Sequence, residues 1–179
     1  MKEWNAPSGA GNDIREGSDP QVTAVIYPDE ESKKATEKAM ALLLHKDRTE
    51  HELIDRLKAA KFSDEAVSFA LEYVSSYGYI DDLRYAKGYT DYHKTSKSRR
   101  EIRRKLKEKG ISDDILSEIF SDYMTEEGKD PEEIAIKALV DKRLRGKGVS
   151  DLTYEEKQKQ MRYLAGKGYP TDLIKRVFS

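Results

Sequence analysis

The sequence contains the same helical segment three times, and this repeat constrains the fold more than any other feature. Residues 51–71 align without gaps to residues 100–120 at an offset of 49, which pairs Leu57 with Leu106. Residues 162–178 match the second copy at an offset of 58. A self-similar chain folds as tandem units that bury their apolar faces within the unit and against their neighbours. The repeat therefore indicates a row of small units instead of one thick core.

Each copy carries the same signal for the start of a helix, a Ser or Thr followed three residues later by Glu. In such a capping box the hydroxyl accepts a hydrogen bond from an orphan N–H group, and the Glu reaches back to the cap. Each cap contributes about 1 kcal/mol to helix stability. The three boxes are Thr49 with Glu52, Ser98 with Glu101 and Thr153 with Glu156.

Apolar residues recur at helical spacing before and after each box, so each repeat holds three helices. Glycines 78, 110, 146 and 168 stand where helices should end. The predicted fold is all-α, an elongated, curved array of three tandem three-helix repeats. The predicted helices span 33–46, 50–60, 64–76, 82–94, 99–109, 113–124, 131–145, 154–167 and 171–178.

The repeats divide the chain into four parts. We expect repeat 1 at 33–82, repeat 2 at 83–130 and repeat 3 at 131–179, preceded by a tail at 1–32. The tail is acidic, and its stretch 21–27 (QVTAVIY) predicts a short strand with a hairpin partner near Trp4.

Composition excludes several classes of protein. The absence of cysteine removes disulfides, thiolate zinc sites and thiol catalysis. The sequence has neither a secretory signal segment nor an apolar run of about 20 residues, so we expect a soluble, cytoplasmic protein.

Catalytic and metal-binding patterns are absent from the sequence as well. The three histidines have no ligand spacing, and the pairs Asp81–Asp82 and Asp113–Asp114 stand at helix starts, where capping accounts for them. Phosphate-binding loops, nucleophile elbows and dinucleotide fingerprints are missing too. We therefore predict a protein that is not an enzyme and needs no cofactor.

The helix at 99–109 combines a narrow apolar seam with a basic face. Ile102 and Leu106 form the seam, and the basic side chains gather on one flank. At the equivalent positions the first copy has Glu, His, Ile, Asp and Lys, and the third has Lys, Gln, Met, Arg and Ala, so the repeat does not require basic residues there. We predict that this flank, called the stripe below, binds an anionic partner; a solvated helix face is the alternative. Its members are Arg99, Arg100, Arg103, Arg104 and Lys107.

Two further groups of residues have a functional and a structural interpretation. A second basic patch at 137–147 either extends the binding surface or complements the dipole of a helix C-terminus. Tyrosines at 73–92 either stack on bases or pack as core, and core packing is the stronger prediction. The patch comprises Lys137, Lys142, Arg143, Arg145 and Lys147, and the tyrosines are Tyr73, Tyr77, Tyr79, Tyr85, Tyr89 and Tyr92.

Three stretches resemble the RecX family of bacterial regulatory proteins: GYIDDLRYAKGY (78–89), REIRRKLKEKGISDDI (100–115) and RYLAGKGYPTDLI (162–174). The resemblance implies a protein that lodges in the groove of the RecA recombinase filament and modulates, mainly by inhibition, its ATPase, strand-exchange and coprotease activities in recombination and the SOS response. It also implies a weak direct contact with DNA, and we expect a monomer that does not bind membranes.

The predicted partner-binding residues combine the stripe with the basic side chains near the end of the patch. The predicted residues are Arg99, Arg100, Arg103, Arg104, Lys107, Lys142, Arg143, Arg145 and Lys147.

Two other functions remain open. A module that binds DNA directly would show a salt slope of about −3.5 on single strands. A helical adaptor for another protein is the third possibility.

Overall fold

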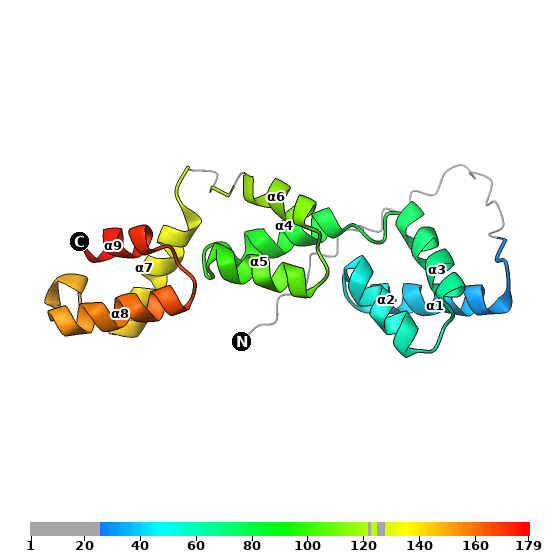
Figure 1. Ribbon diagram of the computed structural model, residues 1–179, viewed down its shortest axis with the longest axis horizontal. Helices are drawn as coiled ribbons and strands as arrows, with labels where there is room; N and C mark the ends of the chain where they lie inside the picture. Colours follow the sequence, from blue (N-terminus) through cyan, green and yellow to red (C-terminus); the bar gives the residue numbers. More distant parts are fainter. Residues whose placement is uncertain (1–25, 122, 125–127) are drawn as a thin grey trace, which may run out of the picture. The chain divides into compact units, whose positions relative to one another are not determined.

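The computed structural model describes residues 26–121, 123–124 and 128–179 (Figure 1). Over these residues the chain forms nine α-helices and one 3₁₀ turn, and contains no strand, which confirms the predicted all-α fold. The predicted strand at 21–27 and its hairpin partner near Trp4 lie outside the described residues, except for Ile26 and Tyr27, which are irregular.

The helices follow one another in three groups of three (Figure 1). The chain also divides into two compact units, one ending at Tyr85 and one running from Ala86 to Ser179, so the division falls inside the fourth helix. The helices are α1 (Glu30–His45), α2 (Glu50–Ala59), α3 (Asp64–Ser76), α4 (Asp82–His93), α5 (Arg99–Glu108), α6 (Asp113–Ser121), α7 (Pro131–Leu144), α8 (Tyr154–Gly166) and α9 (Thr171–Phe178), with the 3₁₀ turn at Val149–Asp151.

The first unit is built around the packing of α1 against α3, with α2 in contact with both. Small residues on α1 let these helices approach closely, and the leucines of α2 fill the remaining space. Burying one such leucine stabilises the fold by about 1.5–3 kcal/mol. The core of this unit comprises Ala35, Ala39, Leu53, Leu57, Ala66, Val67, Ala70 and Val74.

The second unit contains repeat 2 from Ala86 onward and all of repeat 3. Ile102, Leu106 and Leu116 are fully buried in repeat 2. In repeat 3, α9 packs against both α7 and α8. The repeat 3 core comprises Ala135, Ile136, Val140, Leu144, Leu152, Leu164, Tyr169, Leu173, Ile174 and Phe178.

Helix starts follow the predicted caps. The capping boxes at Thr49 and Thr153 are complete, and the Ser98 hydroxyl accepts a hydrogen bond from the Glu101 N–H at 3.2 Å. Helix α1 begins three residues earlier than predicted, because the Asp29 carboxylate accepts a hydrogen bond from the Ser32 N–H at 2.6 Å and caps it.

The same turn follows the middle helix of every repeat, which is α2, α5 or α8. Its pivotal residue has a positive φ of +69° at Lys61, +83° at Gly110 and +90° at Gly168. This left-handed conformation favours glycine, so Lys61 is the strained member of the set. The bond that closes each turn joins Phe62 N–H to Leu57 C=O at 3.4 Å, Ile111 N–H to Leu106 C=O at 3.1 Å, and Tyr169 N–H to Leu164 C=O at 3.3 Å.

The tyrosine prediction is correct in part. Tyr85 and Tyr89 are buried, as core packing requires. Tyr77, Tyr79 and Tyr92 are largely exposed, so for them the core prediction is wrong. Tyr92 lies one residue before α4 ends and packs edge-on against His93, while the rings of Tyr77 and Tyr79 stack on one another at 6.1 Å.

Candidate functional site

The apolar seam of α5 is buried as predicted, and this orients the stripe. Ile102 and Leu106 have no exposed surface. Because they point into repeat 2, the opposite flank of the helix faces solvent. The exposed side-chain fraction is 42% for Arg103, 58% for Arg104 and 50% for Lys107. The structure therefore brings the stripe together on one accessible face.

Carboxylates of the same chain contact most of the stripe. Asp113, at the start of α6, forms ion pairs with Arg103 at 3.1 Å and with Lys107 at 2.9 Å. Glu108 pairs with Arg104 one helical turn away. The stripe is thus less positive than the count of basic residues in the sequence suggests.

These surface pairs are weak. The hydrogen bond from Lys107 lowers the pKa of Asp113, and that from Lys105 lowers the pKa of Glu108, so both carboxylates are ionised at neutral pH. Exposed ion pairs contribute only about 0–1 kcal/mol each. A partner that offers anionic oxygens can therefore replace these contacts at small cost.

Arg99 has a structural role that the sequence did not reveal. Its backbone N–H donates to the Glu132 carboxylate of α7 at 2.8 Å, and its guanidinium lies 4.4 Å from the centre of the Tyr123 ring. The side chain of Glu132 is only 4% exposed, and burial raises its pKa. The Arg99 side chain also forms an ion pair with Glu132 at 3.9 Å, so its replacement would remove this pair and the contact with Tyr123 while leaving the backbone hydrogen bond in place.

Arg100 differs from the other stripe residues. It is exposed, and within the described part of the chain it forms no ion pair or hydrogen bond through its guanidinium. All five of its N–H donors are thus available to a partner.

The members of the second patch differ in their contacts and exposure. Lys137 pairs with Glu133 at 2.7 Å, and Arg143 donates to Gln160 at 2.8 Å while its guanidinium lies 3.7 Å from the Tyr163 ring. Arg145 ends α7 in a left-handed conformation, with φ of 51°. Lys142, Arg145 and Lys147 are exposed. Only these last three resemble a free binding surface.

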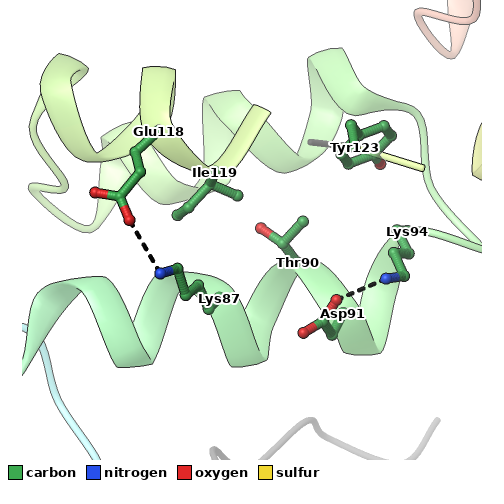
Figure 2. Close-up of a pocket in the computed structure, with 7 residues that line it drawn as sticks. All are labelled: Lys87, Thr90, Asp91, Lys94, Glu118, Ile119 and Tyr123. Atoms are coloured by element: carbon green, nitrogen blue, oxygen red, sulfur yellow. Dashed lines mark hydrogen bonds and ion pairs between the residues drawn. The ribbon is translucent and has the colours of Figure 1, made fainter. Parts of the chain in front are cut away.

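A separate hollow of about 330 Å³ lies between α4 and α6. Figure 2 shows Thr90 and Ile119 across the hollow, with two ion pairs at its rim: Lys87 with Glu118 at 3.0 Å, and Lys94 with Asp91 at 2.7 Å. The buried hydroxyl of Thr90 has no hydrogen-bond partner among the described residues. The charges at the rim balance, so this hollow has no preference for an anionic or cationic ligand.

Among the described residues, no group of His, Asp and Glu side chains is arranged to hold a metal ion. No helix in the same residues combines the length and apolarity needed to cross a bilayer.

Comparison of the three repeats shows that the basic character of α5 is not needed for folding. The positions equivalent to Arg103 are Ile54 in α2 and Met161 in α8, and both pack against the cores of their own repeats. An apolar residue at position 103 would therefore suit this architecture. The packing of this repeat therefore does not require an arginine at position 103.

Three residues near the stripe were missed from the sequence: Glu132, Tyr123 and Arg176. They are 24 to 77 positions from Arg99 along the chain, and no local pattern connects them to α5. By contrast, the Arg104–Glu108 pair has the i,i+4 spacing that a helical projection reveals.

Three domain models of one protein family match this chain, and each model covers one of the three repeats. The first three-helix domain of RecX matches residues 35–73, the second matches 81–118 and the third matches 132–178.

Curated proteins named "Regulatory protein RecX" are similar over most of the chain. The protein of Vibrio campbellii is 31% identical over 144 residues, which is 80% of this chain and 88% of that protein. The protein of Legionella pneumophila (strain Corby) is 32% identical over 146 residues, with coverage of 81% and 93%.

Solved structures are similar in fold. The crystal structure of RecX from Lactobacillus salivarius superposes with a TM-score of 0.66 at 22% identity, covering 82% of this chain and 94% of that one. A second crystal structure of regulatory protein RecX has the same TM-score at 24% identity, with coverage of 82% and 72%.

Proposed function

The chain belongs to the RecX family, and from this membership we propose that it is a non-enzymatic regulatory protein that binds the RecA nucleoprotein filament. Binding modulates, mainly by inhibition, the ATPase, strand-exchange and coprotease activities of the filament in recombination and the SOS response. The protein acts as a cytoplasmic monomer, and its contact with DNA is weak. The curated relatives, which are named regulatory proteins, support the regulatory class.

The observation that carries the proposal is the accessible α5 stripe, which the other two repeats do not share. Arg100 is unpaired within the described residues, and the exposed pairs of Arg103 and Arg104 can be exchanged. A filament of protein on DNA offers both carboxylates and phosphates to such guanidinium groups. The exposed cations Lys142, Arg145 and Lys147 of repeat 3 are a second contact region.

The pattern of charge favours a nucleoprotein filament over naked DNA. Asp113 and Glu108 interrupt the stripe, so a phosphate backbone lying along α5 would meet negative charges at intervals. A surface of mixed charge is suited to a protein partner, where complementary charges determine orientation and specificity. The DNA contact is therefore secondary.

Co-sedimentation tests the proposal. Filaments of RecA on single-stranded DNA should carry the full-length protein into the pellet, while naked single-stranded DNA at equal nucleotide concentration should retain much less. Arg100→Glu with Arg104→Glu should weaken pelleting about tenfold or more, because two cations at i,i+4 become anions on the stripe.

Lys34→Glu with Lys38→Glu is the matched control. It changes charge by the same amount at the same helical spacing on the exposed surface of α1. Equal pelleting with naked DNA and with filaments would favour the DNA-binding alternative. Failure to pellet with either would remove the proposal.

A further inference from the structure

An open, shallow cleft lies between repeats 2 and 3 at the start of the stripe. Its volume of about 470 Å³ falls within the range of about 300–1,000 Å³ that is typical of ligand pockets. Helices α5, α7 and α9 and the turn before α9 supply its walls. The lining residues are Arg99, Arg100, Arg103, Asp130, Glu132, Gly168, Pro170, Asp172, Leu173 and Arg176.

Partly buried hydrogen bonds between the two repeats hold the walls of this cleft in place. The Ser98 hydroxyl donates to the Lys167 carbonyl at 2.7 Å, and the Glu132 carboxylate accepts from the Arg99 N–H at 2.8 Å. Ser98 has no exposed surface. The cleft is therefore formed before a partner arrives, which lowers the entropic cost of binding.

Gly168 brings the turn before α9 close to α5. A Cβ atom at this position would lie 3.1 Å from both the Arg100 Cδ and the Ser98 Oγ, closer than normal packing allows. The backbone of the turn thus packs against the stem of Arg100. This contact positions the Arg100 guanidinium at the wall of the cleft.

The cleft has more hydrogen-bond donors than its own carboxylates use. Asp130 caps α7, and Glu132 is engaged with Arg99. Arg103 pairs with Asp113 and Arg176 with Glu133, each through one terminal nitrogen, so both guanidinium groups keep further N–H donors. With Arg100, three guanidinium groups are available to an anionic group in the cleft.

The shape and polarity of the walls select among anions. Pro170 and Leu173 add an apolar surface, which suits the methylene stem of a side chain better than the polar backbone of a nucleic acid. Asp130 and Asp172 would repel the neighbouring phosphates of a strand, whereas a single carboxylate fits between guanidinium groups in a bidentate manner.

From this arrangement we propose that the cleft between repeats 2 and 3 is an acceptor for one Glu or Asp side chain of the protein partner, held by Arg100, Arg103 and Arg176. This inference rests on the proposed function for the identity of the partner. It adds that repeat 3 contacts the partner through an ion pair between an arginine and a carboxylate. It adds Arg176, which no charge pattern in the sequence singled out.

The chemistry of the cleft can be tested without the filament. In the ¹⁵N-labelled full-length protein, N-acetyl-glutamate amide should shift the Nε–H resonances of Arg100 and Arg176 at constant ionic strength and leave that of Arg145 unchanged. N-acetyl-glutamine amide, the neutral isostere, should give no shift. Dimethyl phosphate should require at least about threefold higher concentration for half-saturation.

Two variants separate the cleft from the rest of the stripe. Arg100→Gln should raise the half-saturating glutamate concentration about tenfold, whereas Arg104→Gln, one turn along α5 and outside the cleft, should not. Absence of any glutamate-specific shift overturns the inference. Equal or tighter binding of dimethyl phosphate overturns the assignment to a carboxylate and makes the cleft a phosphate site.

Inhibition of the RecA filament ATPase by cleft variants distinguishes this inference from the proposed function. Arg100→Gln with Arg176→Gln should raise the concentration for half-inhibition of the RecA filament ATPase at least fivefold, and Lys34→Gln with Lys38→Gln should leave it unchanged. If wild type inhibits and the cleft variant inhibits equally, the cleft inference fails while the proposed function stands. If wild type has no effect, the proposed function fails, and the glutamate titration still decides the chemistry of the cleft.

Discussion

The Ser98 hydroxyl forms one of the hydrogen bonds between repeats 2 and 3, and replacing Ser98 by Ala should measure its contribution. Ser98 Oγ accepts from the Glu101 N–H at 3.2 Å as the N-cap of α5 and donates to the Lys167 carbonyl at 2.7 Å. Loss of an N-cap costs about 1 kcal/mol. Loss of the partly buried bond to the Lys167 carbonyl costs about 1–2 kcal/mol more. The expected destabilisation is therefore about 2–3 kcal/mol.

Ser112→Ala is the control within the same unit. Its hydroxyl accepts from the Ile115 N–H at 3.3 Å in an exposed position, so only the capping contribution of about 1 kcal/mol should be lost. Urea denaturation followed by circular dichroism at 222 nm gives both values. For a slope of about 2 kcal/mol per molar, the midpoint should fall by about 1–1.5 M for Ser98→Ala and about 0.5 M for Ser112→Ala. Equal shifts would refute a stabilising bond between the repeats.

Three other substitutions test local features of the fold. Lys61→Gly should raise the free energy of unfolding by about 1 kcal/mol, because φ at this residue is +69°; a decrease in urea denaturation would show that the lysine side chain matters more than the strain. Thr90→Val should stabilise by about 1 kcal/mol by removing an unpaired buried hydroxyl, and destabilisation would reveal a partner in solution. Burial lowers the pKa of His93 to about 4, so its neutral form is favoured in the folded state. Wild type should therefore lose about 2 kcal/mol relative to His93→Gln as pH falls from about 6.5 to 4, and parallel pH profiles would contradict this.

The architecture was largely predictable because its signals are local. Capping residues such as Thr49 and Thr153 lie within one turn of the groups they bind, so the helix starts could be read from the sequence. The end of α6 was not predicted by such local signals. The helix ends at Ser121, three residues before the predicted end, and Tyr123 leaves it to pack beneath the guanidinium of Arg99.

The electrostatics of the site were less predictable because they depend on tertiary contacts. A helical projection places Arg103 on the basic flank but does not show Asp113, ten residues away, turning back toward it. Nor does it show that Glu132 from another repeat contacts Arg99. For this reason the sequence correctly predicted that the basic flank of α5 is exposed, but it overestimated the net positive charge of that flank.

The most direct test of the central claim is inhibition of the DNA-dependent ATPase of RecA filaments. Wild type and the control Lys34→Glu with Lys38→Glu should inhibit equally, while Arg100→Glu with Arg104→Glu should lose inhibition and keep its helical circular dichroism. This pair is preferable to variants of Arg99, because Arg99 packs on Tyr123 and joins two repeats. Undiminished inhibition by the folded stripe variant would contradict a docking role for α5.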